Sequence, residues 1–177
     1  KLCNIGALPI GENSGLMEIK ASVENFDNDI EINNFKKVDS DLIEKYFEHL
    51  KTLVQPDMIT NTLKFGIDGG NGAIGSVFDD LDKIFNFNYS PLYLEVDGNF
   101  PNHPADPSDK KNLEDLKNLV LENNLDFGVA FDGDADRAVF IDDKGNVISG
   151  SMMTTLISDY LSKENNNLKV VHNVNVS

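Results

Sequence analysis

Residues 132–137 read Asp-Gly-Asp-Ala-Asp-Arg, and we call this segment the acidic loop. Three carboxylates packed so closely repel one another unless a cation lies between them. Carboxylate oxygens are hard ligands, which suit Mg²⁺ or Ca²⁺ better than Zn²⁺. Arg137 adds a planar cation whose geometry fits a phosphate group. The spacing therefore predicts a metal site formed by Asp132, Asp134 and Asp136, with a phosphate-binding arginine beside it.

Two other interpretations of the acidic loop compete with a magnesium site. A solvated acidic turn is one, because turns rich in Asp and Gly are common. A calcium loop of the EF-hand type is the other, but it requires Gly at its sixth position and Glu at its twelfth. Those positions hold Arg137 and Asp143 here. The EF-hand pattern therefore fails, whereas Gly133 and Ala135 are small enough to let the backbone curl around an ion.

Residues 68–75, the glycine turn, contain a second motif. Within them, residues 70–75 read G-x-G-x-x-G, between an apolar strand and a helix. Glu95 follows near the end of the next strand, where a ribose-binding acid is expected in a dinucleotide-binding protein. Asp68 argues against that interpretation, because its charge would face the pyrophosphate. We therefore favour a tight strand-to-helix turn without a ligand.

Residues 97–107, the proline-rich loop, contain three prolines, which restrict φ and remove amide donors. His103 in this loop is a candidate metal ligand or proton carrier. The plainer interpretation is a hydrogen-bonded loop residue, and the sequence favours it.

Alternating strand and helix patterns position these motifs. We expect an irregular segment over 1–37, helices over 42–54, 74–85, from 108 onward and over 151–163, and strands over 63–67, 91–96, 126–131, 138–142, 147–148 and 168–174. This alternation predicts an α/β fold with three α/β/α layers. A hairpin after the acidic loop makes the sheet mixed, although mainly parallel.

Composition limits the partners. The formal net charge of −15 disfavours nucleic acid and anionic membranes, and it also repels a phosphorylated sugar unless a metal offsets it. No apolar run approaches the roughly 20 residues of a membrane span. The single cysteine, Cys3, forms no internal disulfide, which fits a cytoplasmic protein. The chain begins with Lys1 rather than Met, and we expect it to be a fragment.

Three segments in order carry a resemblance to a known family: 68–72, 95–104 and 131–137. Together they resemble the phosphomannomutase/phosphoglucomutase branch of the α-D-phosphohexomutases, with matching order and spacing across residues 38–177. The acidic loop resembles the metal-binding signature of that family.

The resemblance implies a part of a four-domain enzyme. It suggests a remnant of domain 1 over 1–37, a helix and linker over 38–61, the metal-loop domain 2 over 62–165, and the first strand of domain 3 over 166–177. Members of the family carry a phosphoserine in a Ser-His-Asn-Pro loop, and this sequence has no such segment. The expected partners are a phosphosugar substrate and domains 1, 3 and 4.

Site roles also follow from the resemblance. Asp132, Asp134 and Asp136 would bind Mg²⁺, with the phosphoserine completing the shell, and Arg137 would stabilise charge on the transferred phosphoryl group. The complete enzyme, an isomerase, would move a phosphoryl group between O1 and O6 of a hexose through a 1,6-bisphosphate. Without its phosphoserine, the fragment is expected to be inactive. The alternative is a non-catalytic nucleotide- or metal-binding α/β module.

Overall fold

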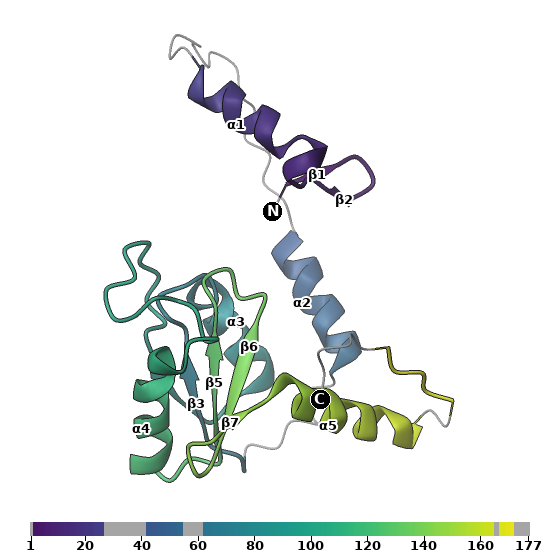
Figure 1. The fold of residues 1–177 in the computed structure, drawn as a ribbon. Coiled ribbons are helices and arrows are strands. Elements are labelled where there is room, and N and C mark those ends of the chain that lie inside the picture. The colour runs from purple at the N-terminus through teal and green to yellow at the C-terminus, as the bar shows by residue number, and fades with distance from the viewer. Residues whose placement is uncertain (1, 27–41, 55–61, 165–166, 172–177) are drawn as a thin grey trace. The chain divides into compact units, whose positions relative to one another are not determined.

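The computed structural model describes residues 2–26, 42–54, 62–164 and 167–171 (Figure 1). The chain divides into two compact units, Lys1–Asp41 and Leu42–Ser177. Over the described ranges, no helix has the length and apolar character needed to cross a membrane. The domain boundaries expected from the sequence stay a prediction.

The first unit contains a small hairpin and a helix. Its elements are β1 (Cys3–Asn4), β2 (Leu8–Pro9), the 3₁₀ helix η1 (Glu12–Ser14) and α1 (Leu16–Glu24). The expectation of an irregular segment throughout 1–37 is wrong for α1. This helix follows Gly15 directly and buries none of its residues. It consists largely of strong helix formers such as Leu, Met, Glu, Lys and Ala, so local propensity rather than a core supports it.

The second unit is built around a five-stranded mixed sheet in the order β4-β3-β5-β6-β7. Its elements are α2 (Leu42–Leu53), β3 (Phe65–Asp68), α3 (Gly75–Phe85), β4 (Tyr89–Leu92), η3 (Lys110–Leu113), α4 (Glu114–Glu122), β5 (Phe127–Phe131), β6 (Ala138–Asp142), β7 (Val147–Ile148) and α5 (Gly150–Glu164). β3 pairs in parallel with both β4 and β5, whereas β6 pairs antiparallel with β5 and with β7. The mixed α/β sheet predicted from the sequence is confirmed.

Two apolar layers cover the faces of the sheet. On one face, α3 packs over a cluster formed by Phe65, Ile67, Ile74, Phe78 and Val129. On the other, η3 and α4 pack over Leu113, Leu116, Val120, Leu125, Ala130 and Ile141. Neighbouring residues of one strand, such as Val129 and Ala130, belong to opposite clusters because strand side chains alternate. The three α/β/α layers follow from this arrangement.

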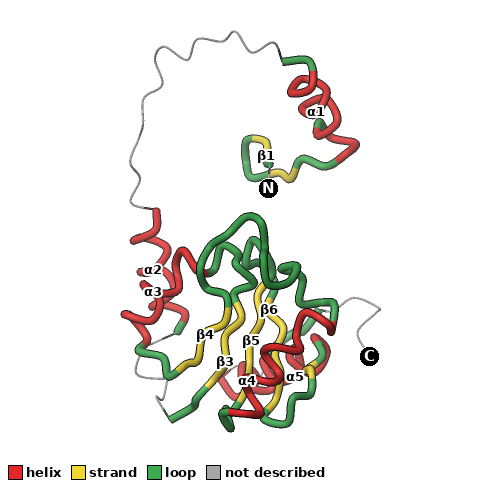
Figure 2. Tube along the Cα trace, turned by 90° about the vertical axis from the view of Figure 1, so that its left-hand side faces the viewer, coloured by secondary structure: helices red, strands yellow, loops and turns green. Residues whose placement is uncertain are grey.

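The chain path creates a break in direction beside β3. From β3 the chain crosses over through α3 to β4, and it then returns through α4 to β5 on the other side of β3. Because such crossovers are right-handed, the two helices lie on opposite faces. The carboxyl ends of β3 and β5 flank the switch point where ligands bind in open α/β sheets. Figure 2 shows large loops gathered at one end of these strands.

Most elements lie within a few residues of their predicted positions, but β4 does not. It ends at Leu92 rather than continuing to residue 96. Tyr93 has a left-handed φ of 52°, which breaks the extended conformation. Pro91 is tolerated because β4 lies at the edge of the sheet. Residues 168–171 form no strand, and the rest of the strand expected over 168–174 lies outside the described residues.

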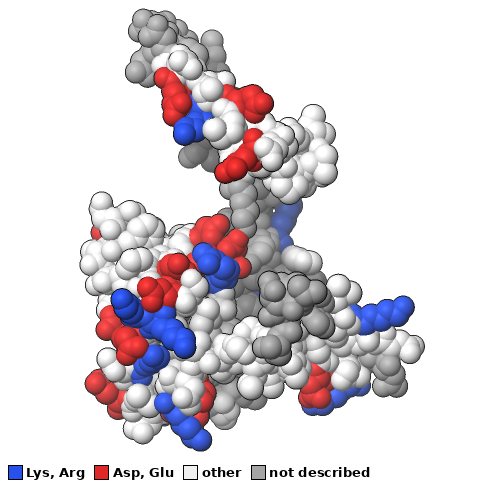
Figure 3. Space-filling view, viewed as in Figure 1, with Lys and Arg blue, Asp and Glu red and all other residues white. Residues whose placement is uncertain are grey.

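Many charged side chains of the second unit lie on its surface, whereas Asp68 and Asp132 are buried. Figure 3 shows acidic and basic side chains interspersed on the face that it presents. Several of them form ion pairs within one helix, such as Lys83 with Asp80 and Lys117 with Glu114. Exposed pairs of this kind contribute little to stability. The buried carboxylates, Asp68 and Asp132, are therefore the charged groups of this unit whose surroundings matter most for a site.

Candidate metal centre

The acidic loop connects β5 to β6, the antiparallel neighbour of β5. Phe131 pairs with Ala138, so the six residues between them close a tight turn. The turn is held by hydrogen bonds from the amide of Asp132 to the carbonyl of Arg137 (3.3 Å) and from the amide of Ala135 to the carbonyl of Asp132 (3.0 Å). Ala135 takes a left-handed φ of 57°. The curl expected from the small residues is therefore present, and it bends the backbone at Ala135.

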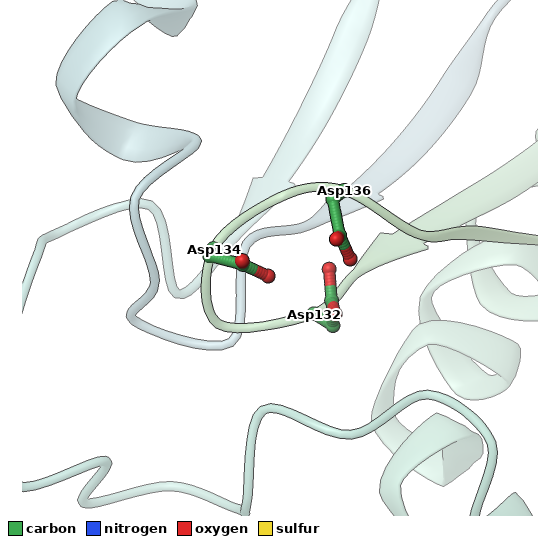
Figure 4. A group of neighbouring side chains, drawn as sticks. All are labelled: Asp132, Asp134 and Asp136. Atoms are coloured by element: carbon green, nitrogen blue, oxygen red, sulfur yellow. The ribbon is translucent and has the colours of Figure 1, made fainter. Parts of the chain in front are cut away.

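This turn brings the three predicted ligands together. One carboxylate oxygen from each of Asp132, Asp134 and Asp136 lies within 4.8 Å of the others. Figure 4 shows the three side chains directed toward the space enclosed by the loop. Asp132 is buried at 2% exposure, whereas Asp134 and Asp136 are exposed. Over the parts of the chain that the structure describes, no other group of three potential ligands gathers in this way.

Arg137 holds the carboxylate of Asp132 in place. The amide of Arg137 donates to Oδ1 of Asp132 (2.9 Å), and its Nε donates to Oδ2 (2.7 Å). Burial acts to raise the pKa of Asp132, but the hydrogen bonds and charge of Arg137 outweigh it and lower the pKa below its usual value. Asp132 is therefore an ionised carboxylate inside the protein.

Arg137 itself remains accessible. Its side chain is 58% exposed, and its Nη1 lies 3.7 Å from Oδ1 of Asp106. Asp106 is a member of this site that sequence reasoning missed. The pKa of Asp106 is lowered, mainly by two hydrogen bonds from Ser108 and also by the charge of Arg137. The sequence shows Asp106 only as an acidic residue followed by Pro and Ser. Its position near Arg137 of the acidic loop results from the fold.

The donor set fits a magnesium ion. Mg²⁺ prefers oxygen ligands at about 2.1 Å, so two ligands on opposite sides lie about 4.2 Å apart. The observed oxygens lie within 4.8 Å of one another, and small rotations of the exposed Asp134 and Asp136 would close the difference. A cation would also relieve the repulsion among three neighbouring carboxylates. The site could hold a metal through Asp132, Asp134 and Asp136.

The glycine turn packs against protein backbone rather than leaving room for a pyrophosphate. A Cβ on Gly72 would lie 2.9 Å from the carbonyl oxygen of Gly133, and a Cβ on Gly75 would collide with the carbonyl oxygen of Leu94. The amide of Ala73 donates to that same oxygen of Gly133 (2.9 Å). Because these glycines lack a Cβ, the acidic loop and the segment after β4 can pack closely against the turn. Glu95 lies beyond the end of β4, and its carbonyl accepts a hydrogen bond from the side chain of Asn71 in the glycine turn (2.8 Å).

His103 lies outside the carboxylate cluster. Its Nε2 is 3.0 Å from Oδ2 of Asp68, and its Nδ1 is 2.8 Å from the carbonyl oxygen of Pro104. This agrees with the interpretation of His103 as a hydrogen-bonded loop residue. Asp68 is 1% exposed and also accepts a hydrogen bond from the amide of Gly70 (2.8 Å).

Residues 44–145, more than half of the chain, match the family model described as phosphoglucomutase/phosphomannomutase, alpha/beta/alpha domain II. The chain belongs to this family. The matched region includes the glycine turn, the proline-rich loop and the acidic loop, so all three segments of the sequence resemblance lie inside domain II, and the resemblance is confirmed.

Relatives in this family share a moderate fraction of the sequence. A phosphomannomutase of Vibrio cholerae serotype O1 is 36% identical over 184 residues, which cover all of this chain and 39% of that protein. A phosphomannomutase/phosphoglucomutase of Pseudomonas putida is 35% identical over 134 residues, which cover 76% of this chain and 28% of that protein. The chain therefore spans well under half the length of these relatives.

Solved structures of the family share the fold. A phosphoglucomutase/phosphomannomutase family protein from Burkholderia thailandensis superposes with a TM-score of 0.62 and 31% identity, over 71% of this chain and 27% of that one. A putative phosphomannomutase from Thermus thermophilus gives a TM-score of 0.64 over 71% of this chain and 30% of that one, at 23% identity. The latter likeness concerns the fold alone.

Proposed function

We propose that the acidic loop is the Mg²⁺ site of a phosphohexomutase that interconverts hexose 1-phosphate and hexose 6-phosphate, of mannose, glucose or both. The reaction would pass through a phosphoserine and a hexose 1,6-bisphosphate. One observation carries the proposal: in a domain II of this family, three carboxylates converge within 4.8 Å beside an accessible arginine.

The carboxylates have distinct roles in this proposal. Asp132 is fixed and ionised by Arg137, so it would provide a permanent anionic ligand. Asp134 and Asp136 are exposed and can adjust their side chains to complete the ligand set. When bound, Mg²⁺ supplies Lewis-acid polarisation of a phosphoryl oxygen. The ion would also offset the negative field of a chain whose formal net charge is −15.

Arg137 would contact the transferred phosphoryl group. In phosphoryl transfer, catalysis depends mainly on positioning and on cations that neutralise charge on the equatorial oxygens. The Nε of Arg137 is engaged by Asp132 at 2.7 Å, which orients the guanidinium plane. Its Nη1 lies 3.7 Å from Asp106, which is a long contact, and the side chain is 58% exposed, so this edge can turn to a phosphate. Nε of Arg137 therefore fixes the orientation of the guanidinium through Asp132, and the Nη groups would bind the phosphate.

The nucleophile and the sugar-binding groups would lie on other parts of the protein. This sequence has no Ser-His-Asn-Pro segment, and it spans 39% of the Vibrio relative. We expect the 177-residue chain alone to show no mutase activity. In the proposed enzyme, the phosphosugar and domains 1, 3 and 4 are the partners of this domain.

A titration of the chain with Mg²⁺ tests the metal site. We expect saturable binding by isothermal titration calorimetry, weakened at least tenfold by Asp134→Asn, because one anionic ligand is lost. The matched control is Asp143→Asn, which removes the same charge from an exposed position in the turn between β6 and β7. Equal weakening by the two substitutions would show nonspecific attraction of cations and would contradict the proposal.

A further inference from the structure

A pair of titratable side chains, Asp68 and His103, takes no part in the proposed ligand set, and its carboxylate is buried. Asp68 ends β3 at 1% exposure, and the side chain of His103 is 13% exposed. They meet at 3.0 Å although 35 residues separate them in the sequence. The ring of Tyr93 packs edge-on against His103, and the hydroxyl of Tyr93 donates to Asp115 (2.7 Å). The pair therefore links the end of β3 to the proline-rich loop, and Tyr93 connects it to α4.

The hydrogen bonds of His103 fix how many protons the pair carries. The carbonyl of Pro104 can only accept, so Nδ1 must bear a proton. Nε2 faces the carboxylate of Asp68, and this contact needs a second proton, either on Nε2 or on Asp68. In both cases the pair is electrically neutral. Burial raises the pKa of Asp68, and the contacts of His103 with Pro104 and Asp68 raise its pKa although burial opposes this, so both shifts favour a retained proton.

The pair joins the two segments that hold the acidic loop. Asp68 also binds the amide of Gly70, which fixes the start of the glycine turn. Ala73 in the same turn donates its amide to the carbonyl of Gly133 (2.9 Å). Two residues beyond His103, the carbonyl of Ala105 accepts from the amide of Gly133 (3.1 Å). Both backbone polar groups of Gly133 are thus bound by segments that the pair connects.

We propose that Asp68 and His103 are positioning residues for the metal loop, holding the glycine turn and the proline-rich loop in the relative placement that fixes Gly133 between two ligands. This inference rests on the proposed metal-binding function. Gly133 separates Asp132 from Asp134, so a shift of either flanking segment would spread the carboxylates apart. Partners that orient metal ligands in this way commonly change metal affinity ten- to hundredfold when they are removed.

A pair of substitutions that differ by one methylene tests the inference. In His103→Gln, the side-chain amide can take the place of Nε2 and donate to Asp68. In His103→Asn, the amide takes the place of Nδ1, retaining the contact with Pro104 but falling short of Asp68. With Mn²⁺ as the probe in electron paramagnetic resonance, we expect His103→Asn to bind about tenfold more weakly than the wild-type chain. We expect His103→Gln to stay within about threefold of the wild-type affinity.

Stability and loop placement are measured on the same variants. Asp126→Asn is the control, because Asp126 accepts from the amide of Lys64 (2.7 Å) at the opposite ends of β3 and β5. A purely structural role predicts that Asp126→Asn and His103→Asn lower the urea midpoint alike and leave Mn²⁺ affinity unchanged. Positioning predicts faster hydrogen exchange of the Gly133 amide in His103→Asn only. Unchanged Mn²⁺ affinity and exchange in His103→Asn, or equal losses in His103→Gln, would overturn the inference.

Two further outcomes separate this inference from the proposed function. If the wild-type chain binds no Mn²⁺, the metal proposal fails, and exchange at Gly133 still decides whether the pair positions the loop. If His103→Asn does not fold, imidazole NMR of the wild-type chain decides instead. The inference requires a low-field NMR signal at pH 7 from the proton between Nε2 of His103 and Asp68. Absence of this signal would contradict the hydrogen bond on which the inference depends.

Discussion

Asp68 and Asp132 occupy equivalent places in the fold but have opposite electrostatic properties. Each lies at the carboxyl end of one of two paired parallel strands, and they are 1% and 2% exposed. The pKa of Asp68 is raised, chiefly by burial, whereas hydrogen bonds from Arg137 lower that of Asp132 in spite of burial. The partners explain the difference, because arginine stays protonated whereas histidine can share its proton. Burial alone therefore does not determine whether a carboxylate is ionised and able to bind a cation; its hydrogen-bond partner also matters.

The glycine turn and the acidic loop also differ, in this case in packing: the glycine turn is closely packed at Gly75, whereas the acidic loop leaves space at Gly133. Gly75 in the glycine turn has no space for a side chain, because a Cβ would collide with the carbonyl oxygen of Leu94. Gly133 in the acidic loop has space, because its Cβ would meet Ala105 at an ordinary 3.7 Å. The two regions should therefore respond differently to substitution.

The largest effect is expected from adding one methyl group to each region. Gly75→Ala must displace backbone, so we expect a loss of about 3 kcal/mol or more in the free energy of unfolding. For Gly133→Ala we expect a loss below about 1 kcal/mol. Urea unfolding followed by circular dichroism measures both. Comparable losses in the two variants would mean that the regions are equally packed.

Magnesium should stabilise the chain through the acidic loop alone. At a concentration one hundred times its dissociation constant, a ligand that binds only the folded state adds about 2.7 kcal/mol. We expect this gain in the wild-type chain and its loss in Asp134→Asn, measured by thermal unfolding with and without Mg²⁺. In the absence of metal, Asp134→Asn should be slightly the more stable, since it relieves repulsion among carboxylates. A gain from Mg²⁺ that survives the substitution would place the ion elsewhere.

The Asp68–His103 pair should make stability depend on pH in the neutral range. The pKa of His103 is raised in the folded chain, so its contribution is complete below the unfolded value of about 6.5 and is lost as pH rises through the folded value. The slope from one such group is at most about 1.4 kcal/mol per pH unit. Urea midpoints between about pH 6 and 9 should therefore fall more steeply for the wild-type chain than for His103→Gln. Parallel curves would show that His103 does not titrate in this range.

The smallest effect concerns the bend of the acidic loop. Ala135 has a φ of 57°, a conformation that costs an L-residue about 1 kcal/mol and costs glycine little. Ala135→Gly removes this strain but increases the entropy of the unfolded chain, so we expect a net gain of about 0.5 kcal/mol in stability. Chemical unfolding measures it, with Ala138→Gly in β6 as a control that should destabilise. A loss in both variants would show that position 135 is not strained.

Much of the fold was predictable because its pattern is local. The strand Ala138–Asp142 and the returning pair Val147–Ile148 match the predicted ranges, since apolar runs and a turn sequence define them. The end of β4 was not predictable, because the left-handed Tyr93 breaks an apolar run that otherwise continues to Val96. The helix Leu16–Glu24 was missed because the glycines and the proline before it dominate the appearance of that segment.

Prediction of the site divides along the same line. The convergence of Asp132, Asp134 and Asp136 could be predicted because a single short stretch of sequence contains them. The contacts of Asp106 with Arg137 and of Asp68 with His103 could not, because each joins segments brought together only by the sheet. From the sequence, the charge of Asp68 argued only against pyrophosphate binding. In the structure, Asp68 is hydrogen-bonded to His103.

The pairing of Phe131 with Ala138 has a consequence for protein engineering. It gives the acidic loop a set length, and both backbone groups of Gly133 are bonded to residues outside the loop. An inserted residue would pull Gly133 away from Ala73 and Ala105, whereas exchanges at the exposed Asp134 and Asp136 leave those bonds intact. A designer who wishes to change the cation preference of the proposed site should therefore vary the donor atoms and keep the number of residues constant.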